Sequence, residues 1–193
     1  MKKTIVSTVL LFFVAGITQL FAYVTPESGK VYRIHNVKSD KVISEDCIAR
    51  QLASVDAAGN DDFKQLWLLK ESNNGYTIQN AYSGQYLHHC AQQSTRIYPT
   101  GAEEAVMYLT QVNGTRYAIG QASGAYLHLD GSNNIVRWYD EANTGSQWQF
   151  EEVNVSSEAI SLQQAAFQKH YAEYQAKLEL MQHIDEYNAL LPT

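Results

Sequence analysis

The stretch SGQYLHH at residues 83–89 returns as SGAYLHL at residues 123–129, and the two copies lie 40 residues apart. They share Ser, Gly, Tyr, Leu and His in register. A second set of markers keeps the same period, because Trp67, Tyr108 and Trp148 stand 41 and 40 residues apart. Repetition at this length predicts several copies of one supersecondary unit packed around a shared core.

Each unit opens with an alternation of large apolar and other residues, which is the period-two pattern of a half-buried strand. Glycine-containing turns follow at short intervals, and no long amphipathic helical pattern occurs before residue 155. We therefore expect an all-β body of three units whose closing aromatics and repeated Tyr-Leu pairs form the core. The aligned opening pairs are Tyr32/Ile34, Tyr76/Ile78 and Tyr117/Ile119.

Three units of this length, each ending near an aromatic, resemble the β-trefoil. The closing triplet Gln65-Leu66-Trp67 narrows the resemblance to ricin B-like lectins, whose repeats end in Gln-x-Trp. The resemblance spans residues 29–153. It implies an all-β fold, a β-trefoil of three repeats of about 40 residues, followed here by a C-terminal amphipathic α-helix.

The N-terminus has the layout of a secretory signal peptide. Lys2 and Lys3 precede an apolar run at residues 5–13, and a second apolar patch ends in a small residue at Ala22. The run is short for a membrane span, although an N-terminal anchor helix is the alternative. We expect a signal peptide at 1–22, a trefoil at 23–153 and a helical segment at 154–193. The short leader resembles those of bacteria, so the protein is expected to be secreted or periplasmic.

Charge and cysteine content limit the partners. The formal net charge is −6 and the basic residues are scattered, which argues against nucleic acid. Cys47 and Cys90 could form a disulfide or remain two free thiols. His88, His89 and Cys90 are adjacent, but consecutive strand residues point to opposite faces, so at most His88 and Cys90 could meet one ion. We expect no metal and no cofactor.

Ricin-like lectins hold sugar hydroxyls with an Asp that directly follows the Gly-x-Tyr-Leu strand, and they stack the ring on a downstream aromatic. By resemblance that Asp position falls on Ser44, His88 and His128. Histidine can also exchange hydrogen bonds with hydroxyls; the alternative is that each ring serves the fold by bonding a backbone carbonyl. The first unit has Ala57 and Ala58 in its platform region and is expected to bind nothing. The predicted carbohydrate-binding residues are His128, Asp130, Asn134, Arg137, Trp138 and Tyr139 in the third unit, and His88, Arg96 and Tyr98 in the second.

Residues 156–191 contain neither Gly nor Pro and predict a helix, with Ser156 or Ser157 as the N-cap. One apolar stripe follows 4-3-4-3 spacing. The stripe could pack on the trefoil, mediate self-association, or lead into a further domain. Its residues are Phe167, Tyr171, Tyr174, Leu178 and Met181.

Catalytic signatures are weak. Ser83 and Ser123 lie in ordinary turns without a G-x-S-x-G motif, and Glu103-Glu104 lies in a loop-like stretch. We therefore expect a non-enzymatic, carbohydrate-binding protein with a glycan or glycoconjugate as its weak partner and with no membrane span after leader removal. The alternatives are a protein-interaction scaffold using helix 157–191, and an accessory domain of a longer exported glycan-processing protein.

Overall fold

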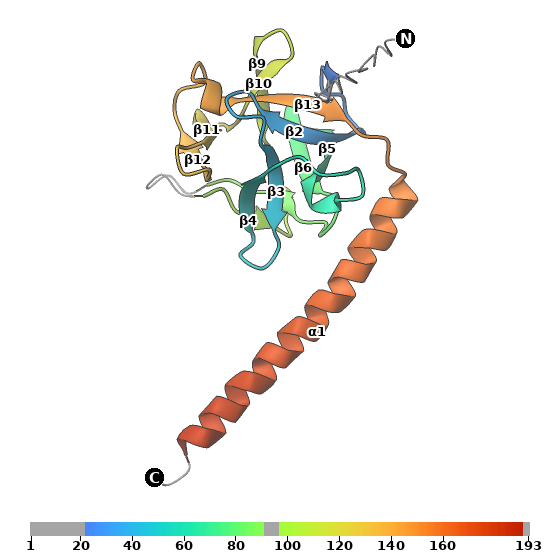
Figure 1. The fold of residues 1–193 in the computed structure, drawn as a ribbon, viewed down its shortest axis with the longest axis vertical. Coiled ribbons are helices and arrows are strands. Elements are labelled where there is room, and N and C mark those ends of the chain that lie inside the picture. Colours follow the sequence, from blue (N-terminus) through green and yellow to red (C-terminus); the bar gives the residue numbers. More distant parts are fainter. Residues whose placement is uncertain (1–21, 91–96, 191–193) are drawn as a thin grey trace, which may run out of the picture.

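A computed structural model describes residues 22–90 and 97–190, in which a β-sheet body is followed by one long helix (Figure 1). The first unit holds β2 (Val31–Asn36), β3 (Val42–Asp46), β4 (Gln51–Val55) and β5 (Leu66–Ser72). The second holds β6 (Gly75–Asn80), β7 (Tyr86–Leu87), β8 (Thr100–Gly101) and β9 (Tyr108–Asn113). The third holds β10 (Arg116–Gln121), β11 (Ala125–Leu129), β12 (Ile135–Trp138) and β13 (Gln147–Glu152). A short β1 (Tyr23–Val24) precedes them, η1 (Phe63–Gln65) and η2 (Thr144–Ser146) are 3-10 turns, and α1 spans Ser157–Ala189.

The body is closed by its last strand. All strand pairs are antiparallel, and β5 joins the first unit to the second by pairing with both β2 and β6. Strand β13 pairs with β10 of its own unit and also with β2 and β1 at the start of the chain. This arrangement brings the three predicted units around one core (Figure 1).

The repeated positions fill that core, as the period-two pattern predicts. Ile34, Ile78 and Ile119 belong to one buried cluster, and Trp67 and Trp148 lie in it with at most 1% exposure. Each indole N–H donates a 3.0 Å hydrogen bond to the backbone carbonyl of the preceding hairpin in its unit, at Ile43 and Leu127 respectively. A buried indole requires such an acceptor.

Two core predictions need correction. Tyr108 is 37% exposed, and the neighbouring Met107 is fully buried in its place. Because adjacent strand residues point to opposite sides, a one-residue difference in register moves the aromatic out of the core. Tyr86 and Tyr126 are only half-buried, whereas the leucines that follow them are core residues.

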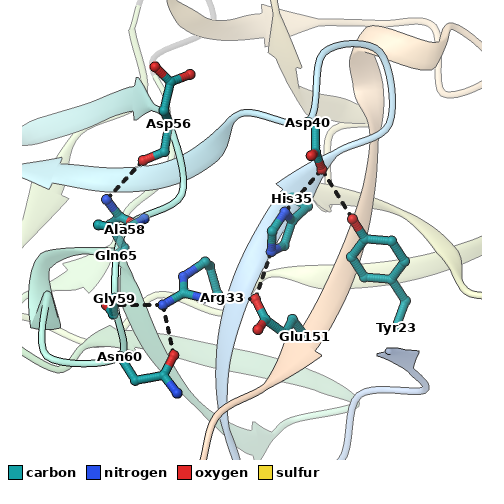
Figure 2. A network of polar contacts seen from close by, with 10 residues as sticks. All are labelled: Tyr23, Arg33, His35, Asp40, Asp56, Ala58, Gly59, Asn60, Gln65 and Glu151. Atoms are coloured by element: carbon teal, nitrogen blue, oxygen red, sulfur yellow. Dashed lines mark hydrogen bonds and ion pairs between the residues drawn. The ribbon is translucent and has the colours of Figure 1, made fainter. Parts of the chain in front are cut away.

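The glutamines of the closing triplets hold the loops that precede them. The Gln65 amide donates to the Asp56 carbonyl at 3.1 Å and accepts from the Ala58 amide at 2.9 Å (Figure 2). Gln147 repeats the arrangement by donating to the Ala142 carbonyl at 2.9 Å. The Gln-x-Trp pattern therefore has a structural role here, since one residue anchors the loop and the other fills the core.

A polar network joins the two ends of the body (Figure 2). Arg33 on β2 is buried and donates to Glu151 on β13 at 2.9 Å. His35 lies between two carboxylates, with Nε2 2.9 Å from Glu151 and Nδ1 3.3 Å from Asp40. The Tyr23 hydroxyl of β1 donates to that same Asp40 carboxylate at 3.1 Å. Hydrogen bonds on both sides compensate for the burial of charged groups at this seam.

The first half of α1 packs on the body. Packing on the trefoil was one of the three alternatives that the sequence left open for this helix. Ile160 is 7% exposed and joins a second apolar cluster with Val31, Leu66, Ala81 and Val153. Gly, Pro and other helix breakers are absent from α1, and the Ser156 hydroxyl accepts from the Ala159 amide at its start.

The repeated Ser-Gly turn of the second unit is part of this docking surface. Gln168 of α1 donates to the Ser83 carbonyl at 2.9 Å, and the Phe167 ring lies 5.1 Å from that of Tyr82. One turn later, Arg50 donates to the Tyr171 hydroxyl at 3.1 Å and lies over its ring. Beyond this point the helix extends away from the body (Figure 1). Within the described part of the chain, no helix combines the length and the apolarity needed to cross a bilayer.

Candidate carbohydrate-binding cleft

The β11–β12 hairpin of the third unit positions the candidate site. Tyr126 pairs with Trp138 and His128 pairs with Val136, so all four side chains share the outer face of the hairpin. A cleft of about 530 Å³ opens on this face. Its lining residues are Ile97, His128, Asp130, Gly131, Asn134, Val136 and Trp138.

Trp138 provides an exposed aromatic surface in the cleft. Its side chain is 41% exposed at the end of β12, which is unusual for so large an apolar group. The indole and the His128 imidazole are stacked, with centroids 5.2 Å apart and 26° between their planes. The stack fixes the orientation of both rings, while the exposed remainder of the indole is available to a ligand.

His128 is held in place from its other side. Its Nδ1 lies 2.9 Å from the Ser146 hydroxyl, so the bond goes to a side chain rather than to the backbone carbonyl expected of a purely structural histidine. A Cβ at Gly145 would approach the His128 Cε1 to 2.6 Å, so this position requires glycine. The Nε2 atom of His128 has no hydrogen-bond partner among the described residues.

The electrostatics of the cleft favour a neutral imidazole. Burial, reinforced by the positive charge of Lys38, lowers the pKa of His128 below its usual value of 6.5, although Asp130 and Asp140 oppose the shift. A neutral imidazole offers one donor and one acceptor nitrogen, which suits a hydroxyl ligand.

Asp130 organises the turn between β11 and β12. Its Oδ1 accepts from the backbone amides of Ser132 at 2.7 Å and Asn134 at 2.9 Å, and its Oδ2 accepts from the Asn134 side chain at 3.3 Å. Partial burial alone would raise the pKa of Asp130, but these hydrogen bonds outweigh it and lower the pKa. The carboxylate therefore stays ionised and keeps acceptor capacity toward the cleft.

Arg137 and Tyr139 do not line the cleft. Arg137 pairs with the core residue Leu127, is 4% exposed, and extends its guanidinium over the Tyr139 ring at 5.2 Å. Both flank Trp138 in sequence, and neighbouring residues of a strand point to opposite faces. Of the six residues predicted in the third unit, four line the cleft and two, Arg137 and Tyr139, lie outside it.

The second unit lacks an aromatic platform in its described part. Tyr98 is fully buried, which raises the pKa of its phenol, and it cannot stack on a ligand. His88 is half-buried, and its backbone amide donates to the Pro99 carbonyl at 3.0 Å. Arg96, also predicted here, lies outside the described residues.

The first unit has a cleft of about 420 Å³ at the corresponding hairpin, but none of its described lining residues is aromatic. Instead the buried Glu45 carboxylate accepts hydrogen bonds from the Ser83 hydroxyl, from Thr100 at 2.7 Å and from the Cys47 thiol at 3.5 Å. Burial, with the nearby Glu45 charge, raises the pKa of Cys47 to about 12. Cys47 and Cys90 are not joined by a disulfide.

Three lining residues were missed by the sequence reasoning. Val136 lies two positions before Trp138, so the alternation rule alone would have placed it on the same face. Ile97 occupies in the second unit the position of Trp138, 41 residues earlier, and bridges to Val136. Gly131 lies in the turn between β11 and β12, and its sequence context predicts a turn but no contact with a ligand. Among residues 22–90 and 97–190, no group of three or more His, Cys, Asp or Glu side chains could hold a metal ion.

Comparison with known proteins supports the fold. A family model described as "Ricin-type beta-trefoil lectin domain-like" matches residues 18–98. Among solved structures, a ricin B-like lectin of Macrolepiota procera in complex with lactose is 18% identical, with a TM-score of 0.59, covering 67% of this chain and 100% of the lectin. The Rhizoctonia solani agglutinin is 19% identical, with a TM-score of 0.59 and coverage of 68% and 100%.

A third similar structure is an enzyme. The GlcNAcα1-4Gal releasing endo-β-galactosidase of Clostridium perfringens is 17% identical, with a TM-score of 0.56, and the match covers 65% of this chain but 33% of the enzyme. A search of curated proteins gave no match. The body therefore has the β-trefoil fold that ricin B-like lectins share, and it is followed by a single C-terminal helix, as the repeats and the Gln-x-Trp triplet predicted.

Proposed function

We propose that this chain is an exported, non-catalytic module that binds carbohydrate weakly through its third unit. The observation that carries the proposal is the exposed Trp138 indole, which lines a cleft beside His128 and Asp130. Binding sites for small molecules combine an apolar surface with a few convergent polar groups, and this cleft has both.

Four of the lining residues have a role in holding a sugar. The apolar C–H face of a pyranose stacks on the exposed part of Trp138. His128 Nε2 then forms a hydrogen bond with one sugar hydroxyl, and the Asp130 carboxylate accepts a hydrogen bond from another. Asn134 stabilises Asp130 through its 3.3 Å contact. No Lys or Arg lines the cleft in the described structure, so a neutral sugar fits it better than an acidic one.

The similar structures support this chemistry at the level of the fold. One of them was solved with lactose, which makes galactosides sensible first probes. Hydrolysis of a glycosidic bond ordinarily uses two carboxyl groups, whereas Asp130 is the single carboxylate among the described lining residues. The leader-like N-terminus supports export.

A glycan array followed by calorimetric titration tests the proposal. We expect a dissociation constant on the order of 0.1–1 mM for a neutral sugar, and Trp138→Ala should weaken it at least roughly tenfold. Tyr139→Ala is the matched control, because it removes a neighbouring exposed ring that lies outside the cleft. Absence of binding to any glycan, or equal affinities for the two variants, would refute the proposed site.

A second candidate, a protein-interaction scaffold, rests on the exposed outer half of α1. Attachment to a longer glycan-processing protein is the remaining alternative, and the partial coverage of the endo-β-galactosidase is consistent with it.

A further inference from the structure

The outer half of α1 carries apolar side chains that the body does not cover. From residue 176 to residue 190, every side chain that the structure describes is exposed. Several are large, with exposures between 37% and 65%, and they contrast with the half-buried Phe167 and Tyr171 of the docked half. Three of the exposed residues keep the four-three spacing of Phe167 and Tyr171 and so share one face of the helix. These residues, here called the outer stripe, are Tyr174, Leu178 and Met181.

The outer stripe continues an interface that already exists. Phe167 and Tyr171 contact Tyr82 and Arg50 of the body, and their rings stack on each other at 5.5 Å. The same four-three spacing then runs through Tyr174, Leu178 and Met181. The C-terminal part of α1 extends past the body (Figure 1). Four-three spacing of apolar residues is the seam that a second helix recognises.

The charges along this half of the helix are unevenly distributed. Toward the body, Lys169 and Lys177 outnumber the single Glu173, whereas Glu179, Asp185 and Glu186 make the free end acidic. An in-register parallel pair would bring two copies of Asp185 together in the seam. An antiparallel pair instead brings the basic part of one helix beside the acidic part of the other.

Antiparallel pairing also gives matched layers. Leu178 of each copy lies against Met181 of the other, and Tyr174 lies against Asp185 in the two outer layers. The carboxylate that interrupts the apolar seam thereby meets a phenol hydroxyl and lies near Lys177. These layers extend over about 17 Å at 1.5 Å per residue, with the two trefoil bodies at opposite ends.

We propose that the outer stripe binds the outer stripe of a second copy of this chain, forming an antiparallel two-fold dimer. The same patch serves both copies, as closed two-fold association requires. The dimer presents two third-unit clefts on one particle, so a surface with many glycans would be held by both clefts at once. That gain in avidity rests on the proposed function, but the dimer itself does not.

Sedimentation equilibrium of the purified protein without sugar, from about 1 µM to about 1 mM, tests the dimer; we expect a dissociation constant on the order of 100 µM. The double variant Leu178→Asp/Met181→Asp should weaken association at least roughly 100-fold. Leu162→Asp is the matched control, because Leu162 is exposed on the opposite face of the helix and should leave the dimer intact. A monomer throughout the range, or a dimer indifferent to the double variant, overturns the proposal.

A charge swap tests the orientation. Lys177→Glu or Asp185→Lys alone should weaken the dimer roughly tenfold, and the two together should restore it, because they exchange charges across an antiparallel seam. No restoration would refute the antiparallel arrangement. A protein that stays monomeric but co-sediments with phosphatidylcholine vesicles would refute the dimer and indicate a lipid surface as the occupant. Because sugar is absent, failure here is distinct from failure of glycan binding.

Discussion

Replacing Ile160 by Ala tests whether α1 is an integral part of the fold. Ile160 is 7% exposed and lies in the apolar cluster between the helix and the body. The substitution removes three carbon groups, worth about 2.4 kcal/mol at about 0.8 kcal/mol each. The site lies at the edge of the body and can partly relax, so the cavity should add little, and we expect a loss of about 2.5 kcal/mol.

Urea unfolding followed by tryptophan fluorescence measures this loss, because Trp67 and Trp148 are buried in the body. The expected change lowers Tm by about 5–10 °C for a chain of this size. Leu162→Ala is the matched control: it lies two residues away on the same helix, is 66% exposed, and should change stability by less than about 0.5 kcal/mol.

Equal effects of the two substitutions would refute the docked helix. A second reading comes from circular dichroism at a helix-sensitive wavelength. If the helical signal and the tryptophan signal of the unsubstituted protein unfold at different urea concentrations, α1 is not part of the same cooperative unit.

Two further predictions concern His128 and Cys47. Because the folded protein lowers the pKa of His128 below 6.5, its stabilising effect is complete above pH 6.5 and is lost as the pH falls toward the folded value. His128→Gln should therefore remove part of the loss of stability below pH 6.5, and superimposable pH profiles of the two proteins would contradict this. With its pKa raised to about 12, Cys47 should react with a thiol reagent at pH 8 roughly a thousandfold more slowly than an ordinary thiol. Two thiols should titrate after unfolding; rapid reaction of the folded protein, or fewer than two thiols, would refute this description.

The repeats predicted the fold well because they report on packing. Residues such as Ile34, Ile78 and Ile119 recur because three equivalent positions face one core. The helix was equally visible, since its stripe and its N-cap are local signals. The first half of the helix lies against the Ser-Gly turn at residues 83–84. The sequence could not predict this contact, because it joins segments about 85 residues apart.

The candidate site was predicted only in part, and for a different reason. Arg137, Trp138 and Tyr139 were grouped because they are adjacent in sequence, yet adjacency on a strand separates side chains onto two faces. Only the pairing register of β11 with β12 shows that Trp138 shares a face with His128. In the second unit the aromatic at Tyr98 suggested a platform, but its position corresponds to Tyr139 rather than to Trp138, and it points into the core.

The pairing of β13 with β1 and β2 also constrains the order in which the protein can fold. β2 can pair early with β3 and β5, but its pairing with β13 and that of β1 with β13 join strands more than 100 residues apart and wait until synthesis has passed Glu152. Contacts of such long sequence separation form slowly, and they complete the body only at the end. The charged seam of Arg33, His35 and Glu151 lies at this junction, so its assembly coincides with closure. A chain still being synthesised therefore remains open along this edge, and closure of the trefoil waits for β13.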